Sequence, residues 1–186
     1  MKSLNKYVNW RVLARFLRNP TQRVYIKELS RILDISSGSA LKAVHMFKDE
    51  GLLNCTIVGQ AHLYWLNNDE PVVKALKRMN ILIRLREADL VERFTDADGA
   101  IISIIMYGSC SSGDYDEKSD LDILVISSSG QSRLARPVRE LEDRLGMQVN
   151  VEIFNLASWN KLKRKNDVFV SEVRRNHIII YGSDLI

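Results

Sequence analysis

Apolar residues in the first third of the chain recur at helical spacing and then give way to two short β-branched runs. Residues 5–18 place apolar side chains three and four positions apart, which predicts an amphipathic helix that ends before Pro20. Two apolar runs on either side of Gly59 predict a β-hairpin. This region is therefore predicted to hold three helices and a hairpin, over residues 5–18, 25–33, about 36–50 and 52–66.

The remaining two thirds of the chain combine strand patterns with amphipathic helices, as expected of an α+β protein. Residues 101–107 and 121–126 are apolar, β-branched runs typical of strands that are buried on both faces. Residues 148–154 alternate between polar and apolar, which predicts a strand with one polar face. Further elements are predicted at residues 133–145 (helix), 158–175 (helix, broken at 166–167) and 177–181 (strand).

A helical pattern over residues 69–95 links the two regions, and Pro71 lies in its first turn. Apolar residues recur from Val72 to Phe94, which predicts a single long helix. Its apolar stripe either packs on the second domain or pairs with another copy of the chain in a homodimer. We expect the first, because a sheet needs helices to cover its faces. The predicted domains are residues 1–68 and 96–186, joined by this connecting helix.

The residues that follow the strand at 101–107 carry the clearest chemistry. Gly108 lets the backbone turn sharply beside a ligand, and Ser109 can cap a helical turn whose free N–H groups bind phosphate. Asp120 and Asp122 stand two residues apart at the head of the next strand, so both project to one face. Two carboxylates on an otherwise apolar strand predict a hard cation between them, and Mg²⁺ fits best.

Glu152 supplies a third acid, in the alternating strand at residues 148–154. Neighbouring strands lie about 4.8 Å apart, so Glu152 is predicted to act as a third metal ligand or as a general base. The alternative is an exposed strand residue. For the aspartates themselves, the alternative is a turn in which an Asp caps its own backbone.

Residues 108–122 carry Gly-Ser, three residues, Gly, five residues and Ser-Asp-x-Asp. This spacing resembles the motif of minimal nucleotidyltransferases in the DNA polymerase beta-like superfamily, and the resemblance extends over residues 81–186. It implies a mixed sheet flanked by helices, with ATP or another nucleoside triphosphate as substrate. The implied nucleotide-binding residues are Gly108, Ser109 and Ser119. The implied catalytic metal ligands are Asp120, Asp122 and Glu152.

One position departs from the family pattern. Members commonly carry Ala-Arg before the second glycine, whereas this chain has Ser111-Ser112. A guanidinium that would neutralise triphosphate charge is therefore missing. The candidates to replace it are Lys118, Arg133, Arg136 and Arg139.

Charge distinguishes the two regions of the chain. Residues 1–66 carry a net charge of +6 and residues 67–186 a net charge of −2, so the first region is suited to a polyanion. Residues 1–68 resemble winged helix-turn-helix domains, with the hairpin as the wing. The resemblance implies DNA contacts from the third helix, at Ser37, Ser39, Lys42 and His45. Alternatively, such a domain docks proteins or dimerises, and Leu41, which flanks this face, would favour a protein contact.

Composition limits the remaining classes. The chain has 186 residues, of which 46% are hydrophobic, and no apolar run approaches the roughly 20 residues of a membrane span. We therefore expect no membrane association, and the absence of a signal-like apolar core predicts a cytoplasmic protein. Cys55 and Cys110 are isolated and fit neither a disulfide framework nor a zinc site.

Together, these observations predict a Mg²⁺-dependent nucleotidyltransferase that uses ATP. Minimal nucleotidyltransferases resembling this chain often act as antitoxins that transfer AMP to a HEPN-type toxin ribonuclease, so a hydroxyl on a partner protein is the expected acceptor. The DNA-binding module would then regulate the protein's own operon. Two alternatives remain open: a transcription regulator that only senses nucleotide, and an enzyme that modifies a small molecule such as an aminoglycoside antibiotic.

Overall fold

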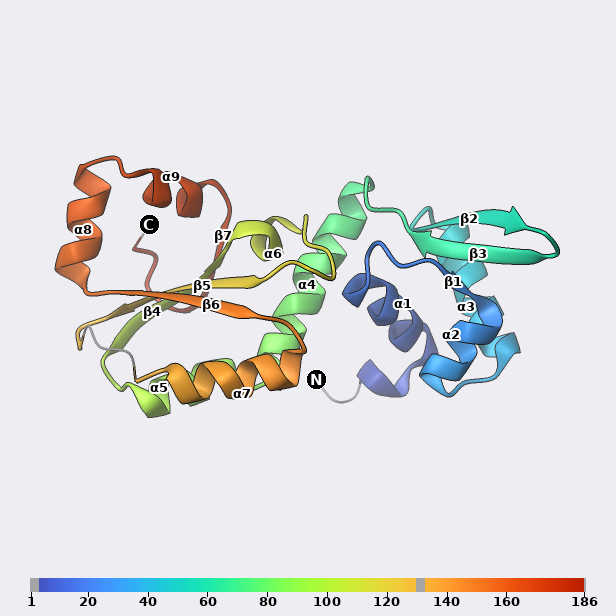
Figure 1. Ribbon diagram of the computed structural model, residues 1–186, viewed down its shortest axis with the longest axis horizontal. Helices are drawn as coiled ribbons and strands as arrows, with labels where there is room; N and C mark the ends of the chain where they lie inside the picture. Colours follow the sequence, from blue (N-terminus) through green and yellow to red (C-terminus); the bar gives the residue numbers. More distant parts are fainter. Residues whose placement is uncertain (1–3, 130–132, 186) are drawn as a thin grey trace. The chain divides into compact units, whose positions relative to one another are not determined.

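The computed structural model describes residues 4–129 and 133–185, and the chain divides into two compact units. Unit one comprises residues 1–80 and unit two comprises residues 81–186, so the boundary lies inside helix α4 (Pro71–Glu87; Figure 1). The sequence pattern had placed the first boundary ahead of this helix. Val73 on α4 belongs to the core of unit one, whereas Ile81 and Leu85 belong to the core of unit two.

Unit one contains the three predicted helices and the predicted hairpin. A 3₁₀ turn (Leu4–Lys6) precedes the first helix, which therefore begins three residues later than predicted. The elements are α1 (Val8–Arg18), β1 (Val24–Tyr25), α2 (Ile26–Leu33), α3 (Ser37–Asp49), β2 (Leu53–Val58) and β3 (Ala61–Leu66). The three strands form an antiparallel sheet in the order β1-β3-β2. Ser36 caps α3, because its hydroxyl accepts a hydrogen bond from the Ser39 amide at 3.1 Å.

Unit two is built on a mixed four-stranded sheet in the order β6-β5-β4-β7. Its strands are β4 (Ile101–Tyr107), β5 (Leu121–Ser127), β6 (Val149–Phe154) and β7 (His177–Gly182). Strands β5 and β6 are parallel and the other pairs are antiparallel, which confirms the mixed sheet. The helices are α5 (Leu90–Ala97), α6 (Gly108–Ser112), α7 (Ala135–Leu145), α8 (Leu156–Arg164) and α9 (Val168–Arg175).

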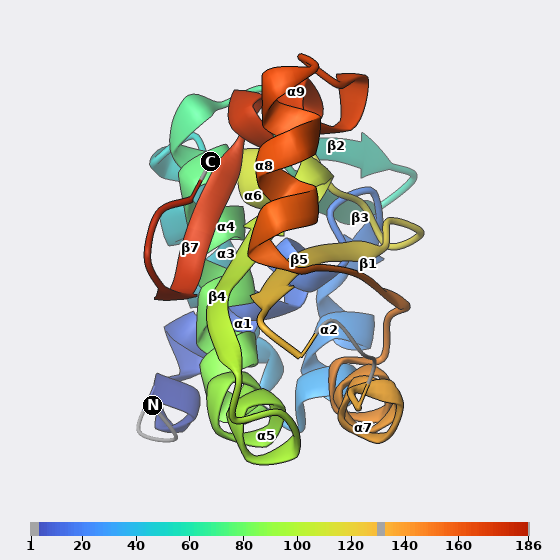
Figure 2. The same cartoon turned by 90° about the vertical axis from the view of Figure 1, so that its left-hand side faces the viewer.

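Helices cover both faces of this sheet, which is why β4 and β5 are almost uniformly apolar. Helices α5 and α7 lie on one face, where Ile123 packs with Leu141 in a continuous core (Figures 1 and 2). Helices α8 and α9 lie on the other face, where Leu124 packs with Trp159. Since side chains alternate along a strand, Asp122 lies on the same face as Leu124, beneath α8 and α9.

The predicted connecting helix is not continuous. It breaks after Glu87, and α5 starts anew at Leu90 because Asp89 adopts a left-handed backbone with φ of 55°. Asp tolerates this conformation better than most residues do. The apolar periodicity continues through the break, so the sequence pattern gave no sign of it. None of the helices within residues 4–129 and 133–185 is long and apolar enough to cross a lipid bilayer.

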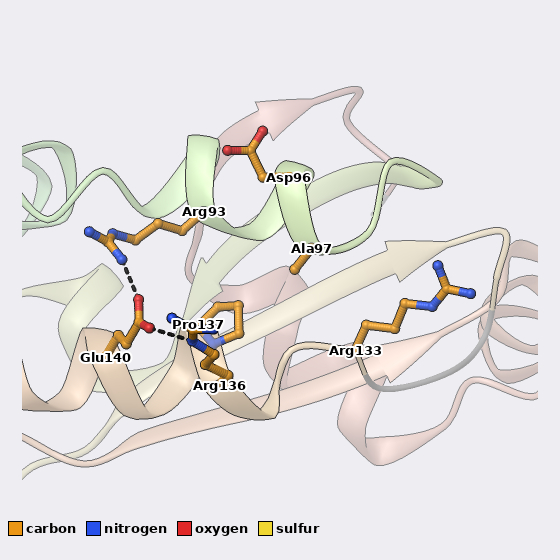
Figure 3. Close-up of a pocket in the computed structure, with 7 residues that line it drawn as sticks. All are labelled: Arg93, Asp96, Ala97, Arg133, Arg136, Pro137 and Glu140. Carbon is orange, nitrogen blue, oxygen red and sulfur yellow. Dashed lines mark hydrogen bonds and ion pairs between the residues drawn. The ribbon is translucent and has the colours of Figure 1, made fainter.

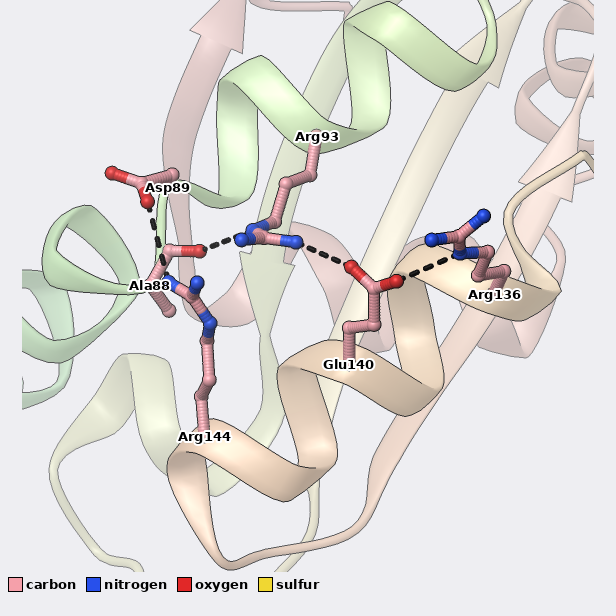
Figure 4. Close-up of polar contacts among 6 residues, drawn as sticks. All are labelled: Ala88, Asp89, Arg93, Arg136, Glu140 and Arg144. Carbon is pink, nitrogen blue, oxygen red and sulfur yellow. Dashed lines mark hydrogen bonds and ion pairs between the residues drawn. The ribbon is translucent and has the colours of Figure 1, made fainter.

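A shallow, open pocket of 420 Å³ lies between helices α5 and α7, lined by Arg93, Asp96, Ala97, Arg133, Arg136, Pro137 and Glu140 (Figure 3). Arg93 and Arg136 both contact the Glu140 carboxylate, and Arg93 also donates to the Ala88 carbonyl at 3.0 Å (Figure 4). Arg144 on α7 pairs with Asp89 at 3.2 Å. These contacts fix the corner between α4 and α5 against α7.

Candidate functional site

Strand β4 ends in a glycine turn that lies directly against a carboxylate. Gly108 has φ of +70°, and a Cβ built on it would lie 2.4 Å from Oδ2 of Asp122. A side chain at this position therefore meets both backbone strain and a steric clash. Antiparallel pairing places Tyr107 opposite Asp122, so the turn that follows β4 has to pass over the Asp122 side chain.

The two predicted aspartates lie together at the head of β5. The side-chain nitrogen of Asn150, on the neighbouring strand β6, lies 3.3 Å from Oδ2 of Asp120 and 3.1 Å from Oδ1 of Asp122. One amide nitrogen therefore contacts both carboxylates, which shows that the two side chains lie beside each other at the head of β5. Carboxylate oxygens are the ligands that Mg²⁺ prefers, so this pair fits such an ion.

The strand register places Asn150, and not Glu152, directly beside Asp122. In the parallel register of β5 and β6, Asp122 is paired with Asn150, whereas Glu152 is paired with Leu124. Glu152 lies on the expected face but about 6.6 Å further along the strand. Within residues 4–129 and 133–185, no three Asp, Glu, His or Cys side chains are close enough together to hold a metal ion.

The site is strongly anionic, and its charges act on one another. Burial raises the pKa of Asp122, a hydrogen bond from Asn150 lowers it, and the charges of Asp120 and Glu172 raise it further. Burial raises the pKa of Tyr107, and the charges of Asp122, Glu152 and Glu172 act in the same direction. Glu172, on α9, is thus an acidic neighbour of the site that the sequence pattern missed.

The serines of the loop differ in what they contact. Ser109 does not cap α6 as predicted, because the helix already begins at Gly108 and has Tyr107 at its N-cap position. Ser109 lies inside the first turn, where its carbonyl accepts hydrogen bonds from Gly113 and Asp114. The Ser119 hydroxyl is 3.1 Å from a carboxylate oxygen of Asp116 and accepts a bond from the Asp116 amide. Ser119 and Asp116 thus stabilise the loop that leads to the aspartate pair.

The serines that replace the family's Ala-Arg stabilise the turn. Ser111 is 3% exposed, and its hydroxyl lies 2.8 Å from the carbonyl oxygens of both Gly108 and Asn176. It therefore ties α6 to the residue that precedes β7. The Ser112 hydroxyl lies 3.1 Å from the Ser109 carbonyl oxygen. Arg133 and Arg136 line the pocket between α5 and α7, on the opposite face of the sheet, and do not replace the missing guanidinium (Figure 3).

In unit one, the four residues predicted to contact DNA are all exposed on α3: Ser37, Ser39, Lys42 and His45. Leu41 beside them is 41% exposed. Ser37 and His45 line a groove of 940 Å³ between α3 and β3, together with Tyr25, Lys27 and other residues. Two arginines of this basic unit make contacts within it, since Arg11 donates to the Leu33 carbonyl and Arg23 stacks on Trp65.

The mixed sheet of unit two thus carries two neighbouring carboxylates beside a glycine turn. Comparison with family models matches residues 87–181, just over half of the chain, to the nucleotidyltransferase domain. The chain therefore belongs to the nucleotidyltransferase domain family. Comparison with curated proteins finds no match.

Two solved structures are similar to part of this chain. One is a crystal structure of a toxin–antitoxin with AMP-PNP, with 22% identity and a TM-score of 0.38, covering 50% of this chain and 71% of that chain. Another is a mutant of the toxin–antitoxin MntA–HpeT, with 18% identity and a TM-score of 0.40, covering 52% of this chain and 73% of that chain.

The first prediction concerns the contact between Gly108 and Asp122. Gly108→Ala is expected to displace the Asp122 carboxylate and to abolish nucleotide binding, measured with a fluorescent ATP analogue. Gly146→Ala is a matched control, because Gly146 also has a positive φ (63°) but no atom lies within 4 Å of its built Cβ. Both variants should lose about 1–2 kcal/mol from backbone strain, and only the first should lose the nucleotide. Equal nucleotide binding by both would contradict the proposed contact.

The second prediction is that Asp122 destabilises the metal-free protein. Its pKa is raised in the folded state, so its ionised form is disfavoured and stability falls as pH rises above about 4. Asp122→Asn should therefore raise the melting temperature in EDTA at pH 7 to 8, and the gain should shrink to nothing near pH 3.5. Asp143→Asn, at an exposed position on α7, should give no such pH-dependent gain.

Proposed function

We propose that the protein is a Mg²⁺-dependent nucleotidyltransferase that moves AMP from ATP to a hydroxyl group of a partner protein. The observation that carries this proposal is the pair of Asp120 and Asp122, held together at one end of the sheet against the Gly108 turn. The family assignment supports nucleotidyl transfer as the reaction class. The acceptor and the nucleotide follow from the resemblance to minimal nucleotidyltransferases.

In this proposal, Gly108 and Ser109 bind the triphosphate through the backbone of the turn, and Ser119 supports the loop that leads to the aspartates. Asp120 and Asp122 hold Mg²⁺, which supplies positive charge to the phosphates when it is bound. The acceptor oxygen attacks the α-phosphorus in line. The bond from the α-phosphorus to the oxygen that bridges to the β-phosphate breaks, and pyrophosphate leaves.

The proton of the acceptor hydroxyl needs a base. Asn150 stands beside the aspartates but its amide is not basic, so we assign this step to Glu152. Glu152 is the acid that remains on the same face of β6, two residues further along. Its charge contributes to the raised pKa of Tyr107, which places it in the electrostatic surroundings of the site.

The acceptor we propose is a tyrosine or another hydroxyl-bearing residue of a HEPN-type toxin ribonuclease. Unit one would act as a winged helix-turn-helix domain that binds operator DNA and regulates expression of the pair. Its support is the order of three helices and a hairpin, the exposed residues of α3 and the basic charge of residues 1–66.

A second function is favoured by two features of the site. Asn150 occupies the position beside the aspartates, and Ser111 and Ser112 provide no guanidinium for the triphosphate. A protein that binds nucleotide without transferring it, and that signals the bound state to a DNA-binding unit, would need neither a third carboxylate beside the aspartates nor a guanidinium at the triphosphate. A small-molecule acceptor remains the other alternative, although it gives unit one no evident role.

The third prediction tests transfer. The protein is incubated with ATP labelled at the α-phosphate and Mg²⁺ in a lysate of the source cell. Label should appear on a protein band, because the α-phosphoryl group is the part that is transferred. Asp122→Asn should leave this band unlabelled, whereas Asp143→Asn should label it normally. Transfer should also fall sharply with Glu152→Gln if Glu152 takes the proton.

Labelled ATP that binds the protein without labelling any protein or small acceptor would exclude the transferase and favour the nucleotide sensor. Label that appears only in a small-molecule fraction would instead show that the acceptor is a small molecule. In both outcomes the wild-type protein still binds nucleotide. A protein preparation that has lost its fold would not, so nucleotide binding distinguishes these outcomes from a failed preparation.

The fourth prediction concerns DNA. Fluorescence anisotropy with a duplex taken from upstream of the protein's own gene should show salt-dependent binding. Lys42→Ala should weaken binding and reduce the slope of log affinity against log salt by about one, as expected for the loss of one phosphate contact. Lys48→Ala removes a lysine from another side of α3 and should leave binding unchanged. Equal losses for both variants would indicate non-specific attraction.

A further inference from the structure

Asn150 acts as a clamp between the two aspartates. Its amide nitrogen lies within hydrogen-bond distance of both carboxylates, at 3.3 and 3.1 Å. An amide has two N–H donors, so it can serve both oxygens at once. The Asn150 oxygen in turn lies 3.3 Å from the amide nitrogen of Gln148. Gln148 therefore holds the Asn150 amide in the orientation that directs its N–H groups, and not its oxygen, toward the aspartates.

This arrangement sets two conditions for a divalent cation. The cation has to displace N–H donors from the carboxylate oxygens, and it gains only two charged ligands from the protein. Mg²⁺ is commonly bound by one or two carboxylates together with substrate phosphates, because the phosphates complete its coordination. Two carboxylates that already accept hydrogen bonds form a weak site for a cation alone.

We propose that Asn150 makes cation binding depend on the nucleotide: the aspartate pair binds a divalent ion weakly by itself and tightly when a nucleoside triphosphate is present. This inference rests on the proposed function, because it takes the aspartates as the metal ligands. It makes Asn150 and Gln148 positioning residues that act through Asp120 and Asp122. The consequence is that the protein does not hold a resident metal ion between turnovers.

The test uses Mn²⁺ as the probe, with the full-length protein and no nucleotide. Electron paramagnetic resonance measures free Mn²⁺ and hence the dissociation constant. Asn150→Asp replaces the clamp with a third carboxylate, so it should bind Mn²⁺ at least about tenfold more tightly than the wild type. Gln148→Ala frees the amide to turn its oxygen toward the ion and should also tighten binding. Asp143→Asn, at an exposed position on α7, should leave the dissociation constant unchanged.

A second measurement uses a fluorescent, non-transferable ATP analogue with and without Mn²⁺. In the wild type, Mn²⁺ should raise analogue affinity strongly, since the coupling between two ligands is reciprocal. In Asn150→Asp, this coupling should be smaller, because the ion is bound beforehand. Melting in EDTA tests the fold of the variant: three carboxylates should lower its melting temperature, and Mn²⁺ should restore it.

Wild-type protein that binds Mn²⁺ alone as tightly as Asn150→Asp would overturn the clamp. So would an absence of coupling between Mn²⁺ and the analogue in the wild type. If the coupling is found but no acceptor is ever labelled, the clamp stands and the proposed transfer fails. If neither the wild type nor Asn150→Asp binds Mn²⁺ under any condition, the aspartates are not metal ligands and both proposals fail.

Discussion

The contact between the Asp122 carboxylate and the backbone of Gly108 is the constraint on which the site depends. Pairing of β4 with β5 sets the end of one strand against the head of the other, so the turn after β4 lies on the carboxylate. A Cβ at that point would displace the Asp122 carboxylate, and the residue there has to accept a positive φ, which glycine does without strain. This contact fixes the start of α6 and the orientation of Asp122 together.

Function and stability oppose each other at this end of the sheet. The face that carries Asp122 continues into Leu124 and Ile126, which pack with Trp159 in a buried apolar core. Carboxylates at the edge of such a core are destabilising unless a cation or hydrogen-bond donors offset their charge. In the protein alone, Asn150 supplies the hydrogen-bond donors. In the proposed reaction, a cation bound together with nucleotide would offset the negative charge of the carboxylates.

The local elements were largely predictable, and the exceptions have identifiable causes. The strands at residues 101–107 and 121–126 were found because strands covered on both faces are continuously apolar. The break at Asp89 was missed because apolar residues recur through it, and one residue in a left-handed conformation leaves no trace in the periodicity. The boundary inside α4 was missed because one uninterrupted apolar stripe contributes to both cores.

The sequence by itself determined the glycine turn, the aspartate pair and the face that they share, because spacing of two residues in a strand fixes a common face. It also placed Asn150 and Glu152 on one face of β6. Only the tertiary structure decided that Asn150 meets the aspartates and that Glu152 does not, because the register between parallel strands is set by a distant crossover and by core packing. The same non-local packing brings Glu172 close to Asp122. It also places Arg133 and Arg136 on the face of the sheet opposite the aspartates.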